Sequence, residues 1–142
     1  MTIYADSSFI TSIYIQDAHA AEISRRMRLA PAIWVTPLNR SELAHAISQN
    51  VFWGKLTDGE ARRARDEFLD DCINGIWIPI NVPETIWDAS VRLAERFGAG
   101  LGVRTLDSLH VVCALELRAE RFWTFDERQA RLAEAVGLNT SS

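Results

Sequence analysis

The sequence predicts an α/β fold, a three-layer α/β/α sandwich in which helices cover both faces of a central parallel sheet. Short apolar segments alternate with longer segments of helical periodicity along the whole chain, which is typical of sheets built from strand–helix–strand units. The length of 142 residues suits a single domain, residues 1–142, with one substantial core. The hydrophobic fraction of 48% is that of a globular protein.

The strands of this sheet are expected in short apolar segments that are rich in β-branched and aromatic residues. Four segments fit this description, at residues 2–5, 33–36, 76–80 and 121–125. A further short edge strand is expected at residues 138–139.

Helices are expected between the strands, where apolar residues recur at helical spacing. They cover residues 7–15, 18–29, 59–73, 83–97, 105–117 and 127–136, and one more begins at residue 37. Thr36 and Pro37 are the residue types preferred at an N-cap and at the first helical position. Gly98 is expected to stop the helix over 83–97 and leave 98–102 as a flexible connector, and Gly137 is expected to end the last helix.

The charge of the chain argues against a protein that coats nucleic acid by bulk electrostatics, because the net charge is -4. All but one of the 15 basic residues are Arg, the exception being Lys55. Arg binds phosphate through a planar fork and Lys does not, although a genome rich in G and C would produce the same bias.

A cytoplasmic location is expected from three features of the sequence. Cys72 and Cys113 lie in apolar helical patterns without the close spacing of a metal site, so buried thiols in a reducing compartment are expected. No apolar run reaches the roughly 20 residues needed to span a membrane. The first residues lack the basic and long apolar regions of a signal peptide.

Four acidic residues occupy positions that ordinary surface acids do not. Asp6 ends the first expected strand and Asp126 ends the fourth. Glu42 lies one to two turns into the helix after the second strand, and Asp107 lies at the start of an apolar helix. In an open parallel sheet, ligands bind beyond the carboxyl ends of the strands. We therefore expect these four side chains to meet at that edge.

Each acid also has a structural explanation when it is taken alone. Asp6 and Asp126 precede helices and are acceptable N-caps, worth about 1 kcal/mol each. Asp107 lies in a first helical turn, where a negative charge suits the helix dipole, and Glu42 has the alternative of being solvent-exposed. Together, however, converging carboxylates would repel one another, a cost that a divalent cation removes.

The chemistry of these side chains selects the expected ion and its use. Oxygen ligands without a cluster of Cys or His favour Mg²⁺ or Mn²⁺ over zinc. Such an ion can bind phosphate oxygens, activate a water molecule and stabilise a leaving oxygen.

Four motifs in the chain resemble those of the PIN-domain family, specifically the VapC-like toxins of bacterial toxin–antitoxin modules. They are Ile-Tyr-Ala-Asp-Ser-Ser at 3–8, Ser-Glu-Leu at 41–43, Arg-Thr-Leu-Asp-Ser-Leu-His at 104–110 and Thr-Phe-Asp at 124–126, with Ala133, Gly137 and Leu138 behind the last. Their order matches the family over nearly the whole chain. The fourth motif departs mildly, because Phe125 and Glu127 flank Asp126 where many relatives have a polar residue and a basic one.

The resemblance implies a ribonuclease toxin of a toxin–antitoxin pair that depends on Mg²⁺ or Mn²⁺, acts on an RNA substrate, forms a homodimer and is inhibited by a VapB-like antitoxin. It implies a catalytic and metal-binding set made of Asp6, Glu42, Asp107 and Asp126. It also implies that Ser8 and Thr124 position an acid or a water molecule, and that Arg104 contacts phosphate. Arg128 is a further candidate for such a contact, with an ordinary surface position as its alternative.

Other functions remain alternatives at this point. A Mg²⁺-dependent phosphatase or receiver-like domain also places Asp at a strand end, but Ser8 stands where the phosphatase motif has a second Asp. A non-catalytic binding protein with a PIN fold is a third possibility, against which stands the presence of all four acids. His110 lies one turn after Asp107, and we expect it to be a hydrogen-bonded core residue rather than a ligand.

Overall fold

A parallel sheet lies at the centre of the molecule in the computed structural model, which describes residues 1–15, 18–29 and 31–141. Within these ranges the sheet has four strands, β1 (Thr2–Ala5), β2 (Ala32–Val35), β3 (Trp77–Pro79) and β4 (Arg121–Trp123), in the order β3-β2-β1-β4. All neighbouring strands pair in parallel, with Ile3 of β1 opposite Ile33 of β2 and Arg121 of β4. Because β1 is an inner strand, the residue after it, Asp6, lies in the middle of the carboxyl edge.

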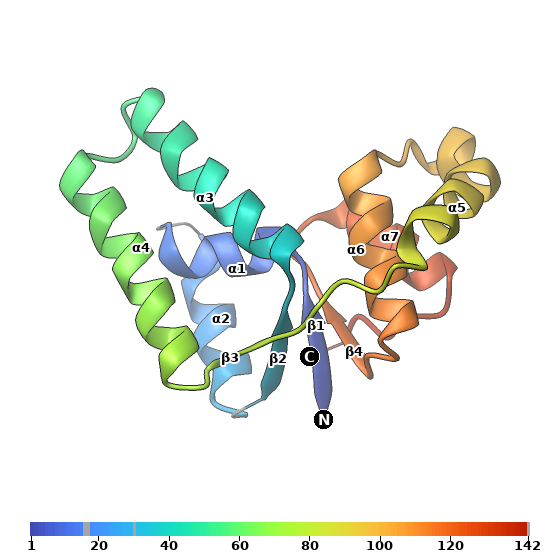
Figure 1. The fold of residues 1–142 in the computed structure, drawn as a ribbon, viewed down its shortest axis with the longest axis horizontal. Helices are drawn as coiled ribbons and strands as arrows, with labels where there is room; N and C mark the ends of the chain where they lie inside the picture. Colours follow the sequence, from blue (N-terminus) through green and yellow to red (C-terminus); the bar gives the residue numbers. More distant parts are fainter. Residues whose placement is uncertain (16–17, 30, 142) are drawn as a thin grey trace.

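Helices cover both faces of the sheet, so the expected three-layer α/β/α fold is confirmed. The described helices are α1 (Ser7–Tyr14), α2 (Ala20–Met27), α3 (Pro37–Phe52), α4 (Asp58–Ile73), α5 (Ile86–Leu101), α6 (Thr105–Glu116) and α7 (Glu127–Ala135). Figure 1 shows α1 to α4 on one side of the sheet and α5 to α7 on the other.

Each face of the sheet has its own apolar cluster, which follows from the alternation of side chains along a strand. Ile3 and Ala5 of β1 pack into the cluster on the side of α1, α3 and α4. Tyr4, between them, packs into the cluster on the side of α5, α6 and α7. Both faces of β1 are therefore buried, as expected for a parallel strand covered by helices on both sides.

Two predicted elements are wrong, and the reasons are local. Residues 98–102 are not a flexible connector, because α5 continues to Leu101 and ends at Gly102, whose φ of 65° lies in the left-handed region. Gly inside a helix costs only about 1 kcal/mol, and Phe97 and Leu101 pack against the core on that side. In the described chain residues 138–139 are not a strand, although the carbonyl of Asn139 accepts a hydrogen bond from Phe122 N at 2.8 Å.

Other boundaries move by a few residues, as is usual for element ends. The fifth helix begins at Ile86 rather than at residue 83. The fourth strand ends at Trp123, so Thr124 and Phe125 belong to the connection that leads to α7. Thr124, a predicted residue of the site, therefore lies in the loop that follows β4 and not in the sheet.

Asn39 fixes the start of α3 to the end of β1. The predicted cap is confirmed: Thr36 is the N-cap of α3 and Pro37 its first residue, and the Thr36 side chain accepts from Asn39 N. The buried Asn39 side chain in turn accepts from Thr36 N at 2.9 Å and donates to the carbonyl of Ala5 at 3.0 Å. Asn39 thereby places α3 beside Asp6, which follows Ala5 in the chain.

Replacing Asn39 with Ala is expected to lower the free energy of unfolding by about 1–3 kcal/mol, because buried polar partners lose their hydrogen bonds. Urea denaturation monitored by circular dichroism measures this loss. Arg40→Ala is the matched control, since Arg40 is exposed and surface changes usually stay within about 0.5 kcal/mol. An equal stability of the two variants would contradict the role assigned to Asn39.

Candidate active site

Asp6 lies at the centre of the site, directly after β1, and is the N-cap of α1. Its Oδ1 accepts from Ser8 Oγ at 2.6 Å and from Phe9 N at 3.1 Å. Its Oδ2 accepts from Thr124 Oγ1 at 2.5 Å. Asp6 is only 4% exposed, and this burial raises the pKa of its carboxylate, against the opposing effect of the two hydroxyls and the Phe9 N–H.

Asp126 is joined to Asp6 through Thr124. Thr124 Oγ1, which donates to Asp6, accepts from Asp126 N at 3.0 Å. Asp126 is also the N-cap of α7, where its Oδ1 accepts from Arg128 N at 2.8 Å and from Gln129 N at 3.1 Å. The capping explanation is therefore confirmed for Asp6 and Asp126, and both caps lie at the same edge of the sheet.

Glu42 reaches the same edge from α3. The alternative explanation, that Glu42 is a solvent-exposed residue, is wrong, because its side chain is only 28% exposed. Its Oε1 accepts from Ser7 Oγ at 2.7 Å and is bound to His110 Nε2. Burial alone would raise the pKa of Glu42. The hydrogen bonds from His110 and Ser7 and the positive charge of Arg104 outweigh this effect and lower the pKa.

Asp107 shares a cavity with Glu42. Its carboxylate lies in the first turn of α6, and its Oδ2 is 3.4 Å from Nε of the exposed Arg104. Both acids line a cavity of about 390 Å³, together with Arg104, Thr105 and Leu106. Arg104 thus adds a positive charge to the lining of this cavity.

The four acids are linked only indirectly, and they form no preformed metal cage. Thr124 links Asp126 to Asp6, Ser7 beside Asp6 binds Glu42, and Glu42 shares its cavity with Asp107. Among the described residues, no group of three or more His, Cys, Asp or Glu side chains is arranged to hold a metal ion. The donor set nevertheless fits a hard divalent cation, because it consists of carboxylate and hydroxyl oxygens. A cation would also stabilise the charged form of the buried Asp6, whose pKa is raised.

Some residues of this site had no clear signal in the sequence. Ser7 donates a hydrogen bond to Glu42. Its position next to Asp6 is the feature of the sequence that indicates a place in the site. His110 is 3% exposed and hydrogen-bonded, as expected of a core residue, but it also binds an acid of the site. Its spacing of three residues from Asp107 places both on one face of α6, which is the signal that could have joined it to the site.

The three-layer fold with acids at the carboxyl edge of a parallel sheet agrees with a family comparison. Residues 3–135 match the PIN domain model, so the chain belongs to the PIN-domain family. No curated protein sequence matches the chain. The part of the chain that the structure describes contains no helix both long and apolar enough for a membrane span.

Solved structures from three organisms share this fold over nearly the full length of both chains. VapBC2 from Rickettsia felis, bound to a DNA fragment from its promoter, has a TM-score of 0.73 at 14% identity and covers 99% of this chain and 98% of its own. FitAcB from Neisseria gonorrhoeae has a TM-score of 0.68 at 12% identity, with coverages of 99% and 96%. VapC20 from Mycobacterium tuberculosis, a sarcin–ricin loop cleaving toxin, has a TM-score of 0.64 at 14% identity, with coverages of 98% for both chains.

Proposed function

We propose that this protein is an endoribonuclease that depends on Mg²⁺ or Mn²⁺ and acts as the toxin of a toxin–antitoxin pair. The observation that supports the proposal is the placement of Asp6, Asp126 and Glu42 at the carboxyl edge of a PIN-domain sheet, with Asp107 lining the same cavity as Glu42. The fold is also that of VapC20, a toxin that cleaves the sarcin–ricin loop. The direct test is cleavage of structured RNA by the purified protein with either ion, and its loss in a chelator.

In the proposed mechanism Asp6, Glu42, Asp107 and Asp126 would hold the ion. When bound, Mg²⁺ or Mn²⁺ would supply an activated water and stabilise the leaving oxygen of the phosphodiester. Arg104 binds a phosphate oxygen of the RNA at the mouth of the cavity, because a guanidinium makes strong charge-assisted hydrogen bonds to phosphate.

Hydroxyl groups and an imidazole position two of the acids by hydrogen bonds. Ser8 and Thr124 hold the two oxygens of Asp6. Ser7 and His110 hold Oε1 of Glu42. The protein thereby keeps the geometry of two acids fixed before the substrate arrives, which lowers the reorganisation needed during the reaction.

Binding of Mg²⁺ or Mn²⁺ is expected to raise the melting temperature, because a ligand of the folded state stabilises it by mass action, by about 2.7 kcal/mol at 100 times the dissociation constant. Asp6→Asn should reduce this gain, since an amide replaces a buried carboxylate of the site. Differential scanning calorimetry with added ion or with EDTA measures both effects. Asp66→Asn, an exposed acid on α4, is the control that should respond like the wild type. An identical ion response in Asp6→Asn would contradict the assignment.

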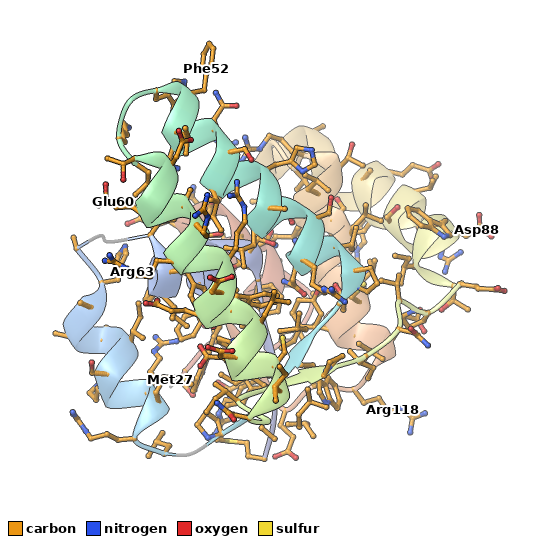
Figure 2. The ribbon with its side chains drawn as sticks, turned by 60° about the vertical axis from the view of Figure 1, so that its left-hand side comes forward. Met27, Phe52, Glu60, Arg63, Asp88 and Arg118 are labelled. Carbon is orange, nitrogen blue, oxygen red and sulfur yellow. The ribbon has the colours of Figure 1, made fainter. Side chains whose placement is uncertain are left out.

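We further propose an inhibitory antitoxin that docks between α3 and α4. An apolar groove of about 380 Å³ lies there, lined by Arg40, Ser41, Leu43, Ala44, Ile47, Arg65, Phe68 and Leu69. At the end of α3, where the chain turns towards α4, Phe52 is 82% exposed and Trp53 is 58% exposed. Figure 2 shows Phe52 pointing away from the body of the molecule. Such a groove suits an amphipathic helix.

The charges beside the groove indicate which residues the docked antitoxin helix should carry. Arg40 and Arg65 flank the groove, so acidic residues are expected beside the apolar anchors of the docked helix. An Arg or Lys of the antitoxin placed among the carboxylates would replace the charge of the ion and block the site.

A homodimer that displays two such sites is part of the same proposal, and sedimentation equilibrium should then give twice the mass of the 16.0 kDa chain.

A further inference from the structure

We infer that His110 and Tyr4 are positioning residues that hold the Glu42 carboxylate in the orientation needed to bind a divalent ion. This inference rests on the proposed function of the site. His110 lies on α6 and Tyr4 on β1, and both side chains are buried. Tyr4 Oη is 2.7 Å from Nδ1 of His110, whose Nε2 is bound to Glu42 Oε1 and lies 3.2 Å from Ser7 Oγ.

The directions of these hydrogen bonds follow from the chemistry of the two ends. An ionised carboxylate can only accept hydrogen bonds, so Nε2 of His110 carries the hydrogen that is donated to Glu42. In the neutral imidazole Nδ1 is then an acceptor. The phenol of Tyr4, which is protonated at neutral pH, supplies the matching donor at 2.7 Å. Tyr4 therefore selects the imidazole tautomer that can donate to Glu42.

The consequence for Glu42 is that one of its oxygens is held and the other is left for a ligand. Ser7 and His110 both bind Oε1. The described residues make no hydrogen bond to Oε2 in the structure, while Glu42 lines the cavity that also contains Asp107. Free rotation of the carboxylate would break both bonds to Oε1, so the network leaves Oε2 as the oxygen available to an ion.

His110 also couples two of the proposed ligands. It lies one turn after Asp107 on α6, and it binds Glu42, which comes from α3 on the other side of the sheet. The rigid turn of α6 thus sets the position of the Asp107 carboxylate and the orientation of Glu42 together. Groups that orient metal ligands in this way typically change metal affinity by about 10- to 100-fold when they are removed.

The first experiment measures Mn²⁺ affinity by isothermal titration calorimetry without RNA. His110→Leu is expected to weaken binding by about 10- to 100-fold and Tyr4→Phe by about 10-fold. His110→Gln, which keeps an N–H donor near the position of Nε2, should recover most of the affinity. Val111→Ala is the packing control, because Val111 is fully buried on the same helix but lies outside the network. Equal affinity in the wild type, His110→Leu and Tyr4→Phe would overturn the inference, as would a comparable loss in Val111→Ala.

The second experiment needs neither metal nor activity. Nitrogen-15 NMR of the metal-free protein should show the His110 ring as the neutral tautomer with hydrogen on Nε2, assigned among the three histidines by its absence in His110→Gln. In Tyr4→Phe this tautomer should no longer be the single form. A ring with hydrogen on Nδ1, or one unchanged in Tyr4→Phe, would overturn the inference. If the wild type bound no ion, the proposed function would fail, whereas the network would still be judged by this measurement.

Discussion

Asp126→Asn is expected to reduce RNA cleavage by at least about 100-fold while the protein stays folded. Removing a group that only orients a metal ligand costs about 10- to 100-fold, so loss of a ligand should reach or exceed the upper value. The fold should persist, because Asn is as good an N-cap as Asp and its Oδ1 can accept from Arg128 N and Gln129 N as Asp126 does now. Its amide nitrogen, however, cannot bind a cation.

The measurement is cleavage of a structured RNA with Mn²⁺ or Mg²⁺, run beside a chelator control and a thermal melt of each variant. Asp66→Asn serves as the matched control, since it removes the same charge from an exposed position on α4. Asp126→Ala should lose activity and, in addition, about 1 kcal/mol of stability with the cap. Undiminished cleavage by Asp126→Asn would point to a contaminating nuclease or to another site.

The sequence predicted the fold because its local signals agree with one another. Apolar strands of four residues or fewer alternate with helices, and Thr36 with Pro37 marks the start of α3 as observed. The predicted helix end at Gly98 is wrong, because helix propensity is a weak local effect that tertiary packing overrides. The residue that ends α5 is Gly102, where the backbone adopts a positive φ.

The candidate site was predictable only in part. The positions of Asp6 and Asp126 follow from strand ends, which local patterns reveal. The contacts of Glu42 and Tyr4 with His110 join residues 68 and 106 positions apart in the chain, and no local pattern carries such pairings. Capping and metal binding are not exclusive alternatives for Asp126, because the cap uses Oδ1 and leaves Oδ2 for an ion.

Expression of this protein alone is expected to stop bacterial growth, and co-expression with a small neighbouring gene that encodes its inhibitor is expected to restore it. Ala44→Arg should abolish the rescue without reducing RNA cleavage. Ala44 is exposed and lines the apolar groove between α3 and α4, so a long charged side chain there would fill the groove and oppose an apolar anchor. Central contacts of an interface are often worth 2 kcal/mol or more, which corresponds to a loss of affinity of at least about 30-fold.

Colony counts with and without the neighbouring gene measure toxicity, and calorimetry with the purified inhibitor measures the affinity directly. Asp66→Arg adds the same side chain on α4 outside the residues that line the groove, and it should remain fully inhibited. Full rescue of Ala44→Arg would place the inhibitor elsewhere on the surface. Harmless expression of the folded, active wild type without any partner would defeat the toxin assignment. It would leave the ribonuclease assignment standing, because toxicity depends on which RNA is cut in the cell, whereas RNA cleavage is measured with the purified protein.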